Sequence, residues 1–455
     1  MGLTNDICEI MHATRYESLG DECVLRVKQA IQDGVAVALA GGREQPVTIA
    51  IAHAKNLGGA PQAGVWGASF KASVVQVANL NAMATHVLDF EPMWSPPTHA
   101  VSPTVPVAFA LADRNGASGH EIITAVAKGL EIQGRLQYAG DQFVPEHLLF
   151  HPPGVAGVFG SAIVAATLLG LDVNGMRHAL GIAASRAGSL LANVGSMTKC
   201  THCGNAAASG LDAALLAQRG FTANPDVLEA HKGVIATFYA NRFDVERLLA
   251  YGKPWRVVDP GLAIKLFPSQ FGTHYAINAG LDIHRLARGA RIERARIVSP
   301  VMKYIDRPQP VSGLAGKFSL QYTAAAAMLD GKVGIDTFTD ERRGRPDMAD
   351  LLGRITLTQD ESIVGDFHHM HIAIEADLAG GQRVSAICRQ PKGSWGVPPL
   401  TTAEHREKLL DCFNRALAPA HVSELIALFE RLETLDAHGV AKIGALIASS
   451  QHGKS

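Results

Sequence analysis

The pattern of apolar residues changes near Pro268, and this change limits the folds that the chain can adopt. Up to about residue 265, apolar side chains recur three and four positions apart, as they do on the buried faces of helices, and strand-type alternation is scarce. Residues 24–38 show this spacing, and Gly41 and Gly42 end the segment. Ser118 stands where an N-cap would begin another helix at Gly119. The first part of the chain therefore predicts helix after helix.

After Pro268, apolar and polar residues alternate, which is typical of strands. Residues 290–298 and 354–358 alternate, and residues 371–388 predict a hairpin that turns at residues 380–381. Between these strands, residues 319–329 and 347–352 have helical patterns, and the helical spacing returns from Thr402. We therefore expect a mainly α protein. A large all-helical domain is formed by both chain ends, residues 1–265 and 396–455, and a smaller α+β lid domain, residues 266–395, is inserted.

Composition excludes several classes of protein. Hydrophobic residues make up 47% and charged residues 18% of the 455 residues, which is typical of a globular chain rather than a disordered one. Lys and Arg number 41 against 42 Asp and Glu, so the broad basic excess of a nucleic-acid-binding protein is absent. Six Cys do not make a disulfide scaffold. With no signal-peptide pattern at the start, we expect a cytoplasmic protein without nucleic-acid or membrane partners.

One charge-free run approaches the length of a membrane span. Residues 154–171 contain no charged side chain, but they are rich in Gly and follow Pro152 and Pro153. No second such run exists in the sequence to accompany it. We therefore expect a helix buried in the core of a large helical domain.

Three familiar site patterns give little support to other chemistries. No Gly-x-Gly-x-x-Gly follows a predicted strand, so a dinucleotide site has no basis. Cys200-x-x-Cys203 lacks the second ligand pair of a structural zinc site, and we interpret it as small residues in a tight turn, with a redox pair as the alternative. His368, His369 and His371 could ligate a metal, but we interpret them as a solvated strand end, in which His369 and His371 share one face. We therefore expect no metal and no cofactor.

Four separated segments place ionisable side chains beside Pro or small residues. They are residues 86–99, with Asp89 and His99 on either side of a Pro-rich stretch; residues 150–155, with His151 before a Pro-started helix; residues 195–207, with Lys199 in a loop; and residues 265–274, at the domain boundary. Lys attracts carboxylates, and His, with an ordinary pKa of about 6.5, transfers protons near neutral pH. This set suits elimination or decarboxylation of a polycarboxylate, in which charge builds up on a carbon beside a carboxylate.

The order and spacing of these segments resemble the MmgE/PrpD family, whose members include 2-methylcitrate dehydratase, cis-aconitate decarboxylase and iminodisuccinate epimerase. The resemblance extends over nearly the whole chain. It is carried by Gln32-Asp33-Gly, the run from Ala84 to Phe90, Thr98-His99, Phe150-His151-Pro-Pro, Met197-Thr-Lys199 with Gly204-Asn-Ala-Ala, Gly220-Phe-Thr, Lys265 with Phe267-Pro268, and the run from Gly316 to Tyr322. It implies a helical domain with a smaller lid, an active site in the cleft between them, no cofactor and a homodimer.

Carried over by position, the resemblance implies active-site roles for Asp89, His99, His151, Lys199 and Lys265. In this hypothesis His99 leads proton transfer, Asp89 orients His99 or the substrate, and His151 assists. Lys199 and Lys265 bind the carboxylates of a di- or tricarboxylate substrate.

Three further positions complete the expected site. Tyr304 matches a tyrosine of the family's lid, Met93 stands where the family commonly has Thr, and Gln270 stands where the decarboxylase has a catalytic His. A thioether donates no useful hydrogen bond, and Gln can hold a carboxylate but cannot transfer a proton. We expect a cofactor-independent lyase, a dehydratase or decarboxylase, acting on a citrate- or aconitate-like polycarboxylate. The alternatives are an epimerase or isomerase of a dicarboxylate, and a catalytically lapsed metabolite-binding homologue, which Met93 and Gln270 motivate.

Overall fold

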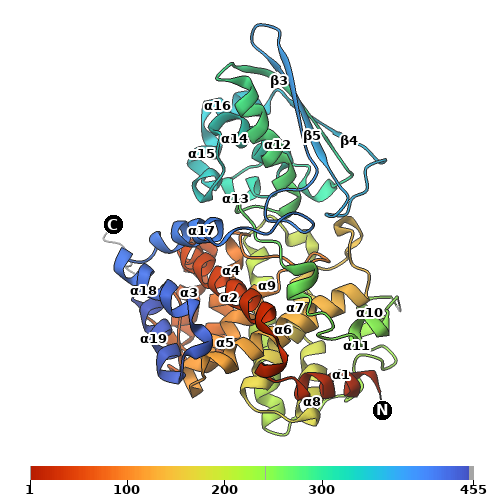
Figure 1. Cartoon of the computed structure of the whole chain (residues 1–455), viewed down its shortest axis with the longest axis vertical. Coiled ribbons are helices and arrows are strands. Elements are labelled where there is room, and N and C mark those ends of the chain that lie inside the picture. The colour runs from red at the N-terminus through yellow and green to blue at the C-terminus, as the bar shows by residue number, and fades with distance from the viewer. Residues whose placement is uncertain (1, 241, 450–455) are drawn as a thin grey trace.

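A computed structural model describes residues 2–240 and 242–449 as a helical body that carries a smaller lid of mixed structure (Figure 1). The body contains α1 (Leu3–Ala13), α2 (Asp21–Gly41), α3 (Gln45–Leu57), α4 (Val74–Val87), α5 (Val101–Asn115), α6 (Gly119–Ala139), α7 (Pro152–Leu168), α8 (Val173–Ala184), α9 (Thr198–Gln218), α10 (Val234–Phe238), α11 (Val245–Leu249), α17 (Thr402–Asn414), α18 (Pro419–Glu430), α19 (Ala437–Ala448) and a short hairpin of β1 (Ala63–Gly64) and β2 (Lys71–Ala72). The C-terminal helices return to the body, where α17 and α18 pack against α2 and α19 packs against α5. The predicted mainly α fold is confirmed.

The charge-free run lies in α7, at the centre of the body. Its side chains are buried from Pro152 to Ala166, and α7 packs against α6 and α9. Small residues permit this close packing, because a Cβ atom on Gly210 of α9 would stand 2.4 Å from the carbonyl oxygen of Val158. In the part of the chain that the structure describes, none of the helices has both the length and the apolar character needed to cross a membrane.

The lid combines helices with one four-stranded sheet. Its elements are α12 (Phe271–Ala287), β3 (Ile292–Ser299), α13 (Gly313–Gly316), α14 (Leu320–Asp330), α15 (Asp340–Gly344), α16 (Pro346–Leu352), β4 (Ile355–Gln359), β5 (Ile372–Leu378) and β6 (Arg383–Cys388). The strand order is β4-β3-β5-β6, with β3 and β4 parallel and the other pairs antiparallel. The parallel pair is joined through the helices α13 to α16, as a crossover requires. Helices cover one face of this sheet (Figure 1).

Buried apolar side chains form two separate clusters. One joins the helices of the body, and the other joins the lid helices to the sheet, with Met93 and Ala263 at its edge. We propose that these clusters are the cores of two domains, with boundaries near residues 265 and 395 as the sequence suggests.

Two local predictions need correction. Cys200 and Cys203 lie within α9 rather than in a tight turn, and both are buried free thiols. His369 and His371 do not share a strand face, because β5 begins only at Ile372. The carboxylate of Asp366 accepts hydrogen bonds from the backbone N–H groups of residues 368 and 369, which holds this segment in a turn.

Candidate active site

A cavity of about 270 Å³ lies between the body and the lid. Seven of the eight residues expected at the site line it. The eighth, Lys265, is fully buried and donates to Asp89, which lines the cavity. The seven are Asp89, Met93, His99, His151, Lys199, Gln270 and Tyr304. Segments far apart in the sequence thus converge on one space.

A larger hollow of about 760 Å³ opens along the end of α6 and α10. We place the candidate site in the smaller cavity, because the buried carboxylates, imidazoles and ammonium groups converge there. Buried titratable groups in a cavity of this size are typical of active sites.

The end of α4 positions the acidic side of the site. Asp89 follows the C-cap residue and adopts a left-handed backbone conformation with φ 52°. Three buried lysines donate to the consecutive carbonyls of residues 88–90: Lys317 over 3.4 Å, Lys265 over 2.8 Å and Lys408 over 2.7 Å. Cations are favoured at a helix C-terminus, where backbone carbonyls lack partners. These lysines come from the lid, the segment entering the lid and α17, so three parts of the chain fix one turn.

The Asp89 carboxylate is ionised between two ammonium groups. Lys199 donates to its Oδ2 over 2.8 Å, and Lys265 donates to its Oδ1. Burial would raise the pKa of Asp89, but Lys199 and Lys265 outweigh burial and hold the pKa well below its usual value. Asp89 is therefore a fixed anion at neutral pH, not a proton donor.

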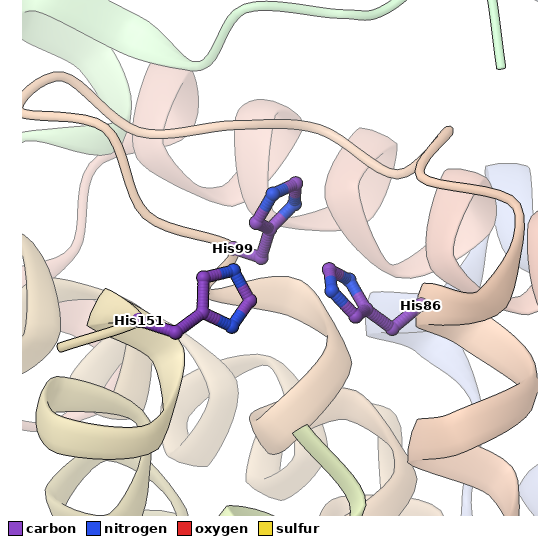
Figure 2. Close-up of side chains that lie close together, drawn as sticks. All are labelled: His86, His99 and His151. Carbon is purple, nitrogen blue, oxygen red and sulfur yellow. The ribbon is translucent and has the colours of Figure 1, made fainter. Parts of the chain in front are cut away.

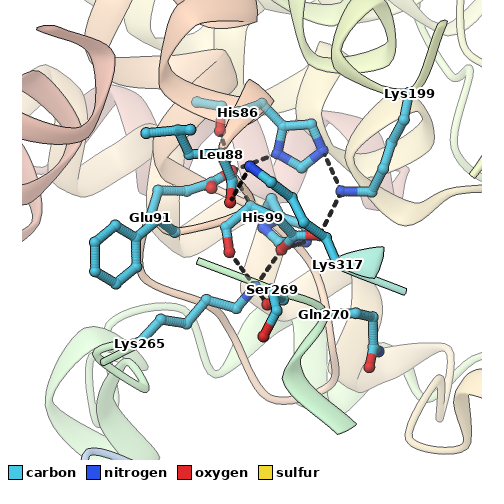
Figure 3. A network of polar contacts seen from close by, with 12 residues as sticks. His86, Leu88, Glu91, His99, Lys199, Lys265, Ser269, Gln270 and Lys317 are labelled. Carbon is cyan, nitrogen blue, oxygen red and sulfur yellow. Dashed lines mark hydrogen bonds and ion pairs between the residues drawn. The ribbon is translucent and has the colours of Figure 1, made fainter. Parts of the chain in front are cut away.

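Lys265 differs from the sequence-based expectation that it binds substrate. Its side chain is fully buried, and its ammonium donates to the carboxylate and carbonyl of Asp89 and to the carbonyl of Ser269 over 2.9 Å. An ammonium has three N–H donors, and all three have protein acceptors here. Lys265 therefore holds Asp89 in place through two hydrogen bonds, and Figure 3 shows its side chain beside Ser269.

Lys199 lies in the first turn of α9, not in the loop that the sequence suggested. Its ammonium donates to Asp89 and contacts Nε2 of His86 over 2.8 Å, which leaves one of its three donors for the cavity. Burial and Lys199 lower the pKa of His86 to about 3, so this imidazole is neutral. Its Nε2 accepts from Lys199, and its Nδ1 therefore carries the proton.

Glu91 connects the imidazoles. Figure 3 shows Glu91 beside His86, and its Oε1 lies 2.5 Å from Nδ1 of that ring. The same oxygen accepts from the hydroxyl of Ser102 over 2.5 Å. The same oxygen is 3.1 Å from Nδ1 of His99, although that ring is not aligned for a hydrogen bond. Burial would raise the pKa of Glu91, but His86 and His99 outweigh it and hold the pKa well below its usual range. Glu91 is a second fixed anion.

Neither ring nitrogen of His99 forms a hydrogen bond with another residue that the structure describes. Its Nε2 lies 3.7 Å from Oδ1 of Asp89, and none of the hydrogen bonds within residues 2–240 and 242–449 uses either ring nitrogen. The carboxylates of Asp89 and Glu91 both lie beside this ring. The ring can therefore accept a proton from a ligand and return it.

One of the two ring nitrogens of His151 has a hydrogen-bond partner. Its Nδ1 lies 3.0 Å from Nδ1 of His202, so one of the two nitrogens must carry a proton. Burial and Lys199 lower the pKa of His202 to about 4, and burial and the same cation hold the pKa of His151 well below its usual value. Both rings are neutral at pH 7, and Nε2 of His151 remains for a ligand.

The rings of His86, His99 and His151 face one another (Figure 2). Each offers a nitrogen within 4.8 Å of the others, a spacing at which a metal ion could be considered. An ion there would need the lone pair on Nε2 of His86, which accepts from the Lys199 ammonium, or would have to displace Glu91 from Nδ1. Either change would break a hydrogen bond of His86 that the structure shows, so this cluster suits proton transfer better than metal binding.

The lid supplies the opposite wall of the cavity. Gln270 is the N-cap of α12, where its Oε1 accepts from the N–H of Gly272 over 2.6 Å and its Nε2 donates to the hydroxyl of Tyr304 over 3.4 Å. Burial, with Glu146 next in size, raises the pKa of Tyr304, so its hydroxyl stays protonated and can donate to a ligand. Met93 pairs with Ala263 through backbone hydrogen bonds of 2.9 Å and is one of the residues that line the cavity.

The comparisons with known proteins agree with this architecture. The model of the MmgE/PrpD N-terminal domain matches residues 5–246, and that of the MmgE/PrpD C-terminal domain matches residues 267–434. The chain belongs to the MmgE/PrpD family. The resemblance read from the sequence is confirmed.

Among its relatives are named enzymes. The cis-aconitate decarboxylase of Homo sapiens is 30% identical, covering 95% of this chain and 92% of the relative. The cis-aconitate decarboxylase of Mus musculus is 29% identical, covering 95% and 91%. The 2-methylcitrate dehydratase of Cupriavidus necator is 26% identical over 66% of each chain. The expectation of a lyase of this family is confirmed, whereas the homodimer and the cytoplasmic location stay predictions.

Sequence reasoning did not select His86 and Glu91 as site residues, although both lie in the segment of residues 86–99. His86 lies in the last turn of α4, and Asp89 follows the C-cap in a left-handed conformation, so helical spacing does not relate the two side chains. Nothing local in the sequence indicates that Glu91 faces two imidazoles, because the turn that brings it there depends on three distant lysines.

Proposed function

We propose that this protein is a cofactor-independent lyase that decarboxylates or dehydrates an aconitate- or citrate-like polycarboxylate. The observation that carries the proposal is the convergence of His99, His151 and Lys199 on one cavity, above two fixed carboxylates. The names of the relatives, cis-aconitate decarboxylase and 2-methylcitrate dehydratase, support this substrate class.

In the proposed mechanism, Lys199 holds one carboxylate of the substrate with its remaining N–H. In decarboxylation, the bond between carbon and the leaving carboxylate breaks, CO₂ departs, and the electron pair moves onto carbon. A protonated His99 then gives its proton to that carbon. In dehydration, neutral His99 removes a proton from carbon, the leaving hydroxide departs with its bonding electron pair, and the protonated His99 returns the proton to it to form water.

The two fixed anions explain why the imidazole of His99 would suit both decarboxylation and dehydration. Asp89 and Glu91 do not compete for the proton, because their pKa values are held low. They stabilise the imidazolium of His99 without taking part in the transfer, and the cationic Lys199 offsets their charge toward the substrate.

Proton NMR of the purified protein with cis-aconitate, 2-methylcitrate and iminodisuccinate tests the proposal. We expect turnover of cis-aconitate or 2-methylcitrate that survives a chelator. Turnover of iminodisuccinate alone would favour an epimerase, and saturable binding without turnover would favour a lapsed homologue. Activity that EDTA abolishes and zinc restores would overturn the metal-free mechanism.

A matched pair of variants tests the role of Lys199. Lys199→Ala should weaken the binding of a polycarboxylate strongly, whereas Cys200→Ala should change it little, because the Cys200 thiol only donates to the carbonyl of Met197. Equal effects of the two changes in a titration would count against the proposed role.

A further inference from the structure

The cavity needs a second cation if it is to hold a polycarboxylate. Lys199 can offer one N–H, and Lys265 has no donor left for a ligand. Among the described residues that line the cavity, Lys199 and Arg307 are the only Lys or Arg side chains. Arg307 therefore stands where another substrate carboxylate could bind.

Arg307 is held in place without an acidic partner. Its Nε donates to the carbonyl of Tyr304 over 3.2 Å, and its Nη2 donates to the carbonyl of Val194 over 2.9 Å. None of the ion pairs in the described ranges involves Arg307, and two of the five guanidinium N–H donors are used in hydrogen bonds there. Its position is fixed by two backbone carbonyls, and its charge remains for a ligand.

The upper limit on the distance between the two cations is compatible with a short polycarboxylate. Nζ of Lys199 lies 5.3 Å, and Cζ of Arg307 5.6 Å, from the centre of the same Phe318 ring, so the two cations are at most about 11 Å apart. A dicarboxylate with two carbons between its carboxyl groups spans about 4 to 5 Å from carbon–carbon bonds near 1.5 Å. Two charge-assisted hydrogen bonds of about 2.8 Å extend that span to about 10 Å.

Gly195 leaves room for the guanidinium. It has φ +95°, which favours glycine, and a Cβ atom there would stand 2.0 Å from Nη1 of Arg307. The loop of Gly195 belongs to the body, while Arg307 belongs to the lid. The side chain thus reaches across the cleft toward the body.

We propose that Arg307 is the second carboxylate-binding residue of this site, and that it selects substrates with two carboxylates separated by a short carbon chain. This inference rests on the proposed function. The guanidinium holds the carboxylate farther from Lys199 through a fork of N–H groups, which an ammonium cannot reproduce.

The test measures dissociation constants by calorimetry for tricarballylate, succinate and butyrate. The variants are Arg307→Gln and Arg307→Lys, and the control is Arg343→Gln. Arg343 is also a lid arginine that donates to a backbone carbonyl, that of Pro310, and to the side chain of Gln309, but it lies outside the cavity. Near-UV circular dichroism checks that each variant is folded.

We expect Arg307→Gln to weaken tricarballylate and succinate roughly 10- to 100-fold and to leave butyrate nearly unchanged, since a hydrogen bond to a charged group is worth about 1.5 to 3 kcal/mol. Arg307→Lys should be intermediate, and Arg343→Gln should match the wild type. An unchanged affinity of folded Arg307→Gln for tricarballylate would overturn this inference while leaving the lyase proposal intact. A wild-type protein that binds none of the polycarboxylates would overturn both.

Discussion

Replacing Lys265 with Met separates a supporting role from a substrate-binding role. The change removes a buried ammonium that neutralises Asp89 and satisfies two backbone carbonyls. Breaking a buried ion pair by removing one partner costs about 3 to 5 kcal/mol. Lys199 still pairs with Asp89, which limits the loss to this range. Because small domains are stable by only about 5 to 15 kcal/mol, such a loss is a large fraction of the total.

The loss should depend on pH with a definite sign. The pKa of Asp89 in the folded protein is held below its ordinary value, so its charge stabilises the fold at neutral pH, and that contribution disappears as pH falls through the folded pKa. Without Lys265 the folded pKa of Asp89 rises. The difference between wild type and Lys265→Met should therefore be full at pH 7 and shrink below about pH 4.

Urea unfolding followed by circular dichroism gives the free energy of unfolding, and steady-state kinetics gives KM. We expect the variant to lose about 3 to 5 kcal/mol. The exposed Lys71→Met serves as a control that should lose little. A Lys265→Met protein with wild-type stability and a strongly raised KM would refute this reasoning and restore the carboxylate-binding role.

Two other predictions concern stability. Lys408→Met should lower the free energy of unfolding by about 3 to 5 kcal/mol, because it leaves the buried Asp33 with only His405 and frees the carbonyl of Phe90. Urea unfolding measures this loss, with Lys442→Met, which removes an exposed ion pair with Glu424, as the control. Equal stabilities of the two variants would contradict the prediction. Burial and Lys265 lower the pKa of His274 to about 3 in the folded protein. Between about pH 6.5 and pH 3, His274 is therefore protonated in the unfolded chain but not in the folded chain, and the free energy of unfolding falls as the pH falls. His274→Phe should therefore reduce the pH dependence in this window by roughly 1.4 kcal/mol per pH unit, and an unchanged slope in urea titrations at pH 7 and pH 5 would argue against it.

Much of the architecture could be predicted because periodicity reports which face of an element is buried. The helix around residues 24–38, the helix that begins at Gly119 and the hairpin at Gly380 and Gly381 follow from such local patterns and from caps such as Ser118. The start of α9 could not be predicted as well, because its N-cap residue Met197 makes no side-chain capping bond. Lys199 was therefore expected in a loop.

Most residues of the candidate site could be predicted from the sequence, but the hydrogen bonds between them could not. Asp89, His99, His151 and Lys199 stand out by residue type and by their neighbours. A sequence does not show, however, where each ammonium directs its donors, because the acceptors are tertiary neighbours. For that reason the sequence predicts a substrate-binding role for Lys265, and nothing local in it singles out Arg307.

Incorporation of solvent deuterium during turnover tests the central claim most directly. The claim is that His99 transfers a proton between solvent and a carbon atom of a polycarboxylate bound in the cavity. In D₂O with cis-aconitate, the wild-type product should carry one deuterium on the newly protonated carbon. His99→Gln should lower kcat/KM by roughly 10²- to 10⁴-fold while its affinity for tricarballylate stays unchanged. A His99→Gln variant that forms the deuterated product at the wild-type rate would contradict the account.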